Sequence, residues 1–224
     1  MSCKFCLAGF FMPKRFLAKG VIYMSKTMNQ TRKIAVTAIL AAMSTALMFL
    51  EFPIPALIPG FIKMDFSELP ALIASFSMGP LCGVTVCLVK NMVHLPFTMS
   101  GGVGELANFI LSSSFVLTAG LVYKHKKTRA GAFLGSLLGA FIMAAISVPS
   151  NYFVVYPIYE KLMPMEAIIG AYQAILPSVK TLLQALLIFN TPFTFVKGML
   201  SVVITFFIYK KISPIIKGTS KTED

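Results

Sequence analysis

The most constraining feature of this sequence is one long stretch without a formal charge. Residues 130–159 contain no Asp, Glu, Lys, Arg or His. A helix needs only about 20 predominantly apolar residues to cross a bilayer. Charged residues make up 12% of the whole chain, whereas soluble domains carry about 25%. Together these features exclude a soluble globular or disordered protein and indicate a helical membrane protein with a single bundle.

Prolines, glycines and polar loops divide the apolar sequence into predicted spans. We expect six of them, at 34–52, 66–79, 81–97, 105–123, 130–159 and 192–209. Residues 53–65 are predicted to form an ordered loop, and 181–191 a lid or interfacial helix. The two spans beside Gly79-Pro80 are short, so we expect a bent pair whose outer ends enclose a cavity with the loops.

The basic residues orient these spans. Of the twenty Lys and Arg, seven lie in 1–33, four in 124–129 and four in 210–224. Six crossings put all three segments in the cytoplasm, as the positive-inside rule favours, whereas five crossings separate them. The predicted fold is therefore an all-α, six-transmembrane-helix bundle with both termini cytoplasmic. The rule also accounts for most of the +12 net charge, so we expect no nucleic-acid partner.

The terminal segments differ in composition from the rest. We expect 1–27 to be a basic N-terminal extension, because Met24 and Met28 are alternative starts, with a membrane domain over 28–217 and a cytoplasmic tail over 218–224. Cys3 and Cys6 form a C-x-x-C, but no second pair completes a zinc site. The sequence therefore predicts no metal.

Polar side chains recur in the outer halves of every predicted span except the second. They are Glu51, Lys90, Asn91, His94, Glu105, Asn108, Asn151, Asn190, Thr191 and Lys197. A charge in hydrocarbon costs about 2.5–3.5 kcal/mol even on insertion scales, so such groups are usually paired or functional. This layer predicts a binding vestibule on the outer side. Two alternatives stay open: Lys197 could snorkel to the headgroups, and Lys90 could pair with Glu105 structurally.

Catalytic motifs are missing from this layer. The sequence has no H-E-x-x-H, no G-x-S-x-G and no phosphate-binding loop, so we expect no catalytic residues and no ATP hydrolysis by this chain. Small residues at four-residue spacing allow helices to approach closely. One such face, on the first span, could serve internal packing or docking of a partner. The other, on the fifth span, is expected to pack internally. The two faces are Ala38, Ala42 and Ala46, and Gly131, Gly135 and Gly139.

Several strings resemble one known family. They are K-M-D-F-S-E-L-P (63–70), M-G-P-L-C-G-V (78–84), Lys90-Asn91, G-V-G-E-L-A-N-F (102–109), T-P-F (191–193), Lys197-Gly198 and K-K-I-S-P (210–214). In these strings the chain is similar to the substrate-binding S components of energy-coupling factor (ECF) vitamin transporters, specifically the riboflavin-specific group. The resemblance covers roughly residues 28–217.

The resemblance implies riboflavin bound at the outer side, under the loop after the first span, in a bacterial plasma membrane protein without a cofactor. Asn151 would meet the imide edge and Lys197 a ring carbonyl. Glu51, Asn91, Glu105 and Asn108 would serve the ribityl chain or brace the pocket, and Leu57, Phe61, Tyr152 and Tyr156 would cover the ring. Ala38 and Ala42 would dock the ECF transmembrane coupling subunit, which carries two cytoplasmic ATPase subunits. The alternatives are an S component for another vitamin, a stand-alone facilitator, or an intramembrane enzyme.

Overall fold

The computed structural model describes residues 14–55, 57–98, 100–161 and 163–217, with side chains described from residue 30 to residue 207. The chain divides into two units, Met1–Ala35 and Val36–Asp224. The second unit contains the cavity. Residues 1–13, including Cys3 and Cys6, and the predicted tail 218–224 lie outside the described residues. The other part of the predicted extension belongs to a helix that begins at Lys14.

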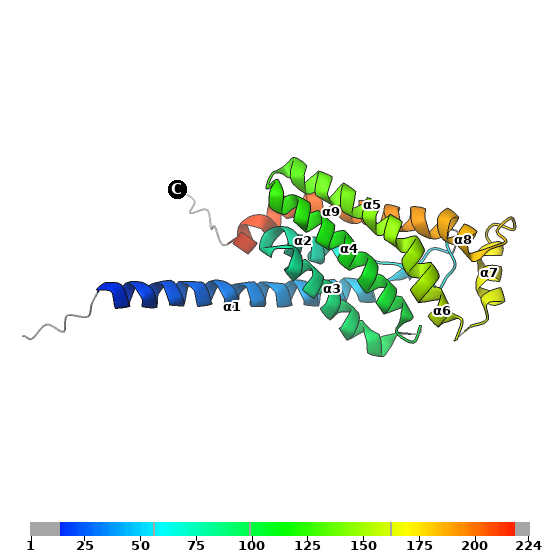
Figure 1. The fold of residues 1–224 in the computed structure, drawn as a ribbon, viewed down its shortest axis with the longest axis horizontal. Helices are drawn as coiled ribbons and strands as arrows, with labels where there is room; N and C mark the ends of the chain where they lie inside the picture. Colours follow the sequence, from blue (N-terminus) through cyan, green and yellow to red (C-terminus); the bar gives the residue numbers. More distant parts are fainter. Residues whose placement is uncertain (1–13, 56, 99, 162, 218–224) are drawn as a thin grey trace, which may run out of the picture. The chain divides into compact units, whose positions relative to one another are not determined.

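The described chain is almost entirely helical (Figure 1). Its longer helices are α1 (Lys14–Phe49), α2 (Glu68–Met78), α3 (Pro80–His94), α4 (Val103–His125), α5 (Arg129–Ser150) and α9 (Thr191–Lys217). The shorter ones are α6 (Tyr156–Tyr159), α7 (Met165–Gln173), α8 (Leu182–Ala185), the 3₁₀ turn η1 (Leu95–Phe97), and two π-helical turns, η2 (Asn151–Val155) and η3 (Leu186–Asn190). Strands β1 (Phe52–Pro53) and β2 (Lys63–Met64) pair antiparallel at the two ends of the predicted loop 53–65.

Five helical segments of the described chain are long and apolar enough to cross a membrane: 30–49, 80–97, 103–125, 129–159 and 182–207. The protein is thus an all-α membrane protein. The second predicted span is shorter than expected, because α2 has 11 residues and reaches only about 17 Å at 1.5 Å per residue. The apolar core of a bilayer is about 30 Å thick.

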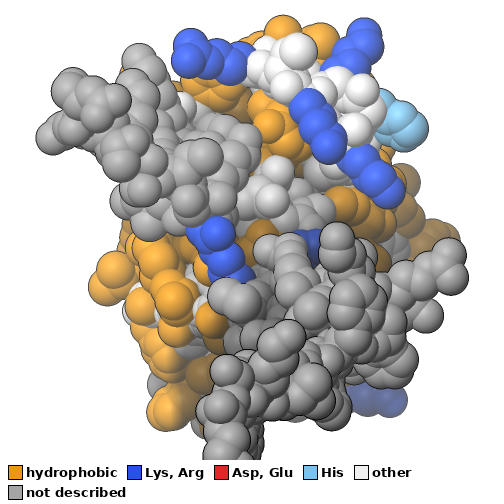
Figure 2. Space-filling model, turned by 90° about the vertical axis from the view of Figure 1, so that its left-hand side faces the viewer, with side chains coloured by type: hydrophobic (Ala, Val, Ile, Leu, Met, Phe, Trp, Pro, Cys, Tyr) orange, Lys and Arg blue, Asp and Glu red, His pale blue; other side chains and the backbone are white. Residues whose placement is uncertain are grey.

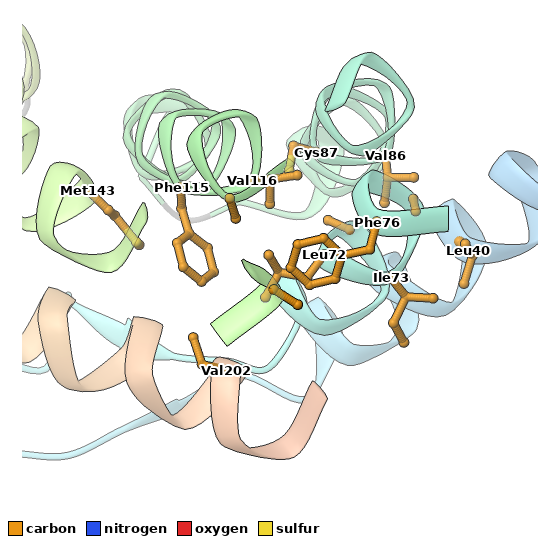
Figure 3. Close-up of a cluster of buried hydrophobic side chains, with 14 of the residues drawn as sticks. Leu40, Leu72, Ile73, Phe76, Val86, Cys87, Phe115, Val116, Met143 and Val202 are labelled. Carbon is orange, nitrogen blue, oxygen red and sulfur yellow. The ribbon is translucent and has the colours of Figure 1, made fainter. Parts of the chain in front are cut away.

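α2 forms the centre of the second unit. Every residue from Glu68 to Phe76 is buried, as expected for a helix that is apolar on all sides. Figure 3 shows its side chains among those of α1, α3, α4 and α9, including Leu40, Leu72, Ile73, Phe76, Val86, Phe115, Val116 and Val202. α2 turns into α3 at Gly79, whose φ of +109° favours glycine.

The last predicted span begins earlier than proline placement suggested. α8, η3 and α9 follow one another without a break from Leu182 to Lys217. A proline inside a helix removes a backbone donor and crowds the preceding turn. The π-helical turn η3 lies directly before Thr191 and Pro192, so the helix changes its hydrogen-bond spacing at the place where the proline lacks an N–H. The prediction of a separate lid over 181–191 is therefore wrong for 182–191.

The glycine face of α5 packs against α4, as predicted. A Cβ at Gly135 would lie 2.8 Å from the carbonyl oxygen of Ala119, and one at Gly139 would lie 2.7 Å from that of Phe115. Both distances are too short for a side chain. The alanine face of α1 differs, since Ala38, Ala42 and Ala46 are exposed. Internal packing therefore does not account for these three residues.

The two ends of the helices differ in charge. The turn between α4 and α5 and its flanks, residues 124–130, are exposed and basic. Figure 2 faces this end and shows Lys and Arg side chains in blue, with no red carboxylate among the described side chains in view. Glu105 lies at the other end of α4, about 30 Å away at 1.5 Å per residue.

Candidate ligand-binding cavity

A cavity of about 390 Å³ opens at the end of the second unit that holds Glu105. This volume falls within the range of small-molecule pockets, about 300–1,000 Å³. Its lining comes from α1, the loop 53–67, α2 to α5 and α9, and the π-helical turns. Apolar and aromatic side chains form part of the wall, among them Ile58, Phe61, Ile62, Leu111, Met143, Val155, Tyr156, Tyr159 and Phe193. The cavity can therefore hold a flat apolar body and present polar groups to it.

Four buried charges lie at and behind one wall of this cavity. The Lys197 Nζ on α9 is 2.9 Å from Asp65 Oδ2 and 3.0 Å from Glu68 Oε1. Lys90 on α3 has no exposed surface, and its Nζ is 3.9 Å from Glu68 Oε1. Two lysines and two acids make the group neutral. Such neutrality is needed, because an unpaired charge in a protein interior is strongly destabilising.

Asp65 is the best-satisfied member of this buried charge group. Its Oδ1 accepts hydrogen bonds from Ser67, from the backbone N–H at 2.8 Å and from the hydroxyl. Its Oδ2 accepts from Lys197 at 2.9 Å and from Asn108 Nδ2 at 3.3 Å. Burial by itself would raise the pKa of Asp65, but the nearby ammonium groups of Lys197 and Lys90 hold it well below its usual range. Asp65 is therefore a fixed anion that anchors Lys197.

Glu68 is less well satisfied by neighbouring hydrogen-bond donors than Asp65 is. Its Oε1 lies near two ammonium groups without a well-directed hydrogen bond, and its Oε2 has no hydrogen-bond partner among the described residues. The side chain is 1% exposed and lines the cavity. Asn108 Oδ1, also at the cavity, likewise lacks a partner within the described part of the chain. This wall therefore presents unused acceptors to a ligand.

A second charged group surrounds His94 at the opening. The His94 Nδ1 is 2.8 Å from Glu105 Oε1, and its Nε2 is 4.0 Å from Glu51 Oε1. Glu51 also pairs with Lys63 of the loop. Through Glu51 and Lys63, these contacts tie the segment between α1 and α2 to α3 and α4.

Two tyrosines and an asparagine join α7 to the spanning helices. Tyr172 on α7 is fully buried, and its hydroxyl donates to Asn190 Oδ1 at 2.7 Å. The hydroxyls of Tyr156 and Tyr172 also hydrogen-bond to each other. Burial, with the neighbouring Tyr156, raises the pKa of Tyr172. The short helix α7 is therefore held against the spanning helices by hydrogen bonds as well as by apolar packing around Ile168.

Comparison with known proteins gives the family. Residues 32–209 match the family described as ECF transporter, substrate-specific component. This chain belongs to that family. A solved structure described as the S component of a bacterial ECF transporter superposes with a TM-score of 0.67 at 30% identity, and the match covers 84% of this chain and 99% of that one. The resemblance seen in the sequence is thereby confirmed.

Curated relatives of this S component are named riboflavin transporters. Riboflavin transporter RibU of Staphylococcus aureus is 31% identical over 190 residues, which is 85% of this chain and 95% of the relative. Riboflavin transporter FmnP of Bacillus subtilis is 31% identical over 188 residues, 83% and 94% of the two chains. RibU of Streptococcus thermophilus is 31% identical over 196 residues, 84% and 86%. Because family members are transporters, this S component is not an enzyme.

The structure brings most of the predicted site residues of the S component together. Glu51, Glu105, Asn108, Asn151 and Lys197 line the cavity, and so do Phe61 and Tyr156. Asn151 donates through Nδ2 to Ser147 Oγ at 3.1 Å. Whether these side chains contact a ligand stays a prediction.

Three predicted residues do not line the cavity. Leu57 is 64% exposed, whereas its neighbour Ile58, whose backbone N–H also donates to the Ile54 carbonyl, is buried and lines the cavity. Tyr152 is 42% exposed. Asn91 is buried, but its Nδ2 donates to the carbonyl of Cys87 one turn earlier, at 2.7 Å. Leu57 and Tyr152 are each adjacent in sequence to a residue that lines the cavity, Ile58 and Asn151, and their contact with a ligand stays a prediction.

The structure also settles the two alternatives for the buried lysines. Lys90 pairs with Glu68 rather than with Glu105, whose partner is His94. Lys197 is 8% exposed and bound to carboxylates, so it does not snorkel.

Sequence reasoning left Asp65, Glu68 and Thr194 out of the predicted site. It also left the second span without a polar group, although Glu68 opens α2. One signal in the sequence could have identified the two acids. The chain has only eight Asp and Glu, and Asp65 and Glu68 stand together at the beginning of an apolar helix.

Proposed function

We propose that this S component binds riboflavin at the outer face of a bacterial plasma membrane and delivers it inward as part of an ATP-driven importer. The observation that carries the proposal is the composition of the cavity. An aromatic and apolar wall faces convergent polar groups, in a chain whose curated relatives are named riboflavin transporters. Riboflavin has the matching parts, a flat isoalloxazine ring with a carbonyl and imide edge, and a polyhydroxylic ribityl chain.

The ring would lie among Phe61, Tyr156 and Phe193, with its polar edge toward Asn151. A side-chain amide offers both a donor and acceptors, as an imide edge requires. Lys197 has three N–H donors, one of which bonds to Asp65, while its Nζ lies 3.0 Å from Glu68 Oε1 without a well-directed hydrogen bond. A donor that Asp65 does not use would meet a ring carbonyl.

The ribityl chain would supply donors to the acceptor-rich parts of the cavity. Glu51 and Glu105 each use one carboxylate oxygen on a basic partner, and a carboxylate has about four acceptor positions. Asn108 Oδ1 has no other partner within the described residues. Hydroxyl groups satisfy such acceptors without adding a charge.

For topology we propose six crossings with both termini in the cytoplasm, α2 and α3 forming a bent pair. The basic residues 124–130 at one end of the helices and the cavity at the other support this orientation. Ala38 and Ala42 would dock the transmembrane coupling subunit, with two ATPase subunits beneath it. Their exposure supports docking over internal packing.

Riboflavin titration of the purified protein tests the binding proposal. Flavin fluorescence should be quenched with one ligand per chain. Asn151→Ala should weaken binding about 10- to 100-fold, since a buried hydrogen bond contributes about 1–3 kcal/mol when its loss leaves a partner unsatisfied. Leu57→Ala, which alters an exposed side chain between β1 and β2, should bind like the parent. Absence of quenching in the parent would refute riboflavin as the ligand.

Uptake into proteoliposomes tests the partners. Labelled riboflavin should accumulate only with the coupling subunit, both ATPase subunits and ATP. Ala42→Leu should keep riboflavin binding but lose uptake. Phe153→Leu, the control on another exposed face, should keep both. Accumulation by the lone chain would instead establish a facilitator.

A further inference from the structure

A fully buried lysine lies behind the cavity wall without reaching the cavity. Lys90 has no exposed surface and is absent from the cavity lining. Its Nζ donates to Ser67 Oγ at 2.5 Å, and the Ser67 hydroxyl donates in turn to Asp65 Oδ1. The same Nζ is 3.9 Å from Glu68 Oε1. Lys90 therefore contacts both carboxylates that hold Lys197, one through a hydroxyl and one directly.

We propose that Lys90 is a positioning residue for ligand binding: its ammonium keeps Asp65 and Glu68 both ionised, so that together they hold Lys197 at the cavity wall. The inference rests on the proposed function for its ligand but on the buried charges alone for its mechanism. With Lys90 the four charges cancel. Without it, two carboxylates would share one ammonium, and the uncompensated charge would be relieved by a proton on one carboxyl.

Glu68 is the carboxyl that would take the proton. Asp65 accepts four hydrogen bonds, all of which favour its charged form. Among the described residues, Glu68 Oε2 has no hydrogen-bond partner. A neutral Glu68 attracts Lys197 less, so the ammonium loses one of its two anchors and its fixed position.

This mechanism predicts unequal effects of two second substitutions. Lys90→Met should weaken riboflavin binding at least tenfold and make the Kd dependent on pH, because Glu68 must lose its proton before it can hold Lys197 in place. Adding Glu68→Gln removes the titrating carboxyl, and Lys90 has no other role in this mechanism. The double variant should therefore bind within about threefold of the Glu68→Gln single variant, with the added pH dependence gone. Adding Asp65→Asn removes the remaining anchor of Lys197, so it should weaken binding further.

Other groups near the site also titrate, so the effect of Glu68 is measured as a ratio of Kd values between two variants that share those groups. The Cys87 thiol lies beside Lys90 on α3, and His94 lies one turn further along, facing Glu105 and Glu51. Both are present in every variant. The pH dependence of the Kd ratio between Lys90→Met and the double variant therefore isolates Glu68. Lys180→Met, an exposed lysine, controls for loss of any lysine.

The outcomes separate this inference from the proposed function. If Lys90→Met binds like the parent at every pH, or if Glu68→Gln and Lys90→Met weaken binding additively, the positioning role is wrong although riboflavin remains the ligand. If the parent does not bind riboflavin, the same variants are compared by thermal unfolding across pH. The losses in Tm should then be less than additive in the double variant, and additive losses in Tm refute the charge mechanism.

Discussion

Asp65→Asn is the substitution whose consequence the structure defines most sharply. Two donors from Ser67 face Oδ1, and Lys197 and Asn108 face Oδ2. An amide has only one oxygen, so whichever way it is turned, its NH₂ group meets two donors. The change also leaves the buried group with one excess positive charge. Breaking a buried ion pair by removing one partner costs about 3–5 kcal/mol.

Thermal unfolding in detergent measures this loss. At about 2–4 °C per kcal/mol for a chain of this size, Tm should fall by about 6–20 °C. Glu160→Gln removes an exposed carboxylate and should shift Tm by no more than about 2 °C, since such surface changes are within about 0.5 kcal/mol. An Asp65→Asn protein as stable as the Glu160→Gln protein would refute the reasoning.

The pH dependence of the Tm difference between the parent and Asp65→Asn follows from the direction in which the pKa of Asp65 is shifted. Its folded-state pKa lies below the ordinary value of 3.8. Its contribution is therefore fully present above that pH and is lost only as the pH falls through the lower folded-state value. The Tm difference between parent and Asp65→Asn should stay constant between pH 5 and 7 and narrow in stronger acid. Narrowing already between pH 7 and 5 would contradict the assignment of Asp65 as a fixed anion.

Two further predictions concern packing and the attachment of α7. Gly139→Ala places a methyl group 2.7 Å from the Phe115 carbonyl oxygen, so Tm should fall by the equivalent of about 1–3 kcal/mol, whereas Gly170→Ala, with nothing within 4 Å, should leave Tm unchanged or raise it. Equal Tm values would show that α4 and α5 separate without cost. Tyr172→Phe removes the donor to Asn190, at about 1–3 kcal/mol, and should speed riboflavin dissociation several-fold in stopped-flow fluorescence, whereas Tyr152→Phe should not. Unchanged dissociation would show that α7 does not hold the ligand.

Much of the fold could be predicted because a membrane protein must separate charged from apolar residues. The uncharged run 130–159 and the basic turn after α4 located two helices and their connection. α2 could not be distinguished from a crossing helix in this way. Bilayer and protein core both select apolar side chains, so hydropathy identified α2 as buried but not as surrounded by protein.

The polar contacts of the site were harder to predict. Lys197 stood out because it is a lone charge in an apolar segment. Its anchor Asp65 is 132 residues away in sequence and lies in a loop, where an acid is unremarkable. The pairing depends on how α9 packs beside α2, which is a property of the folded bundle and leaves no local pattern in the sequence.

The π-helical turns explain why one tyrosine of the fifth span lines the cavity and another does not. In η2 the backbone N–H of Tyr156 donates to the carbonyl of Asn151, five residues back, as in a π-helix. This spacing places Tyr156 above Asn151 on the cavity side, while Tyr152, only one residue from Asn151, points outward. In η3 the Thr191 N–H likewise donates to the Leu186 carbonyl, and the turn ends on the buried Asn190. A helical period of 3.6 residues cannot anticipate either turn. Asn151 and Asn190 therefore line the cavity, and Asn190 bonds to Tyr156 and Tyr172, because of a local helix geometry that the sequence pattern does not show.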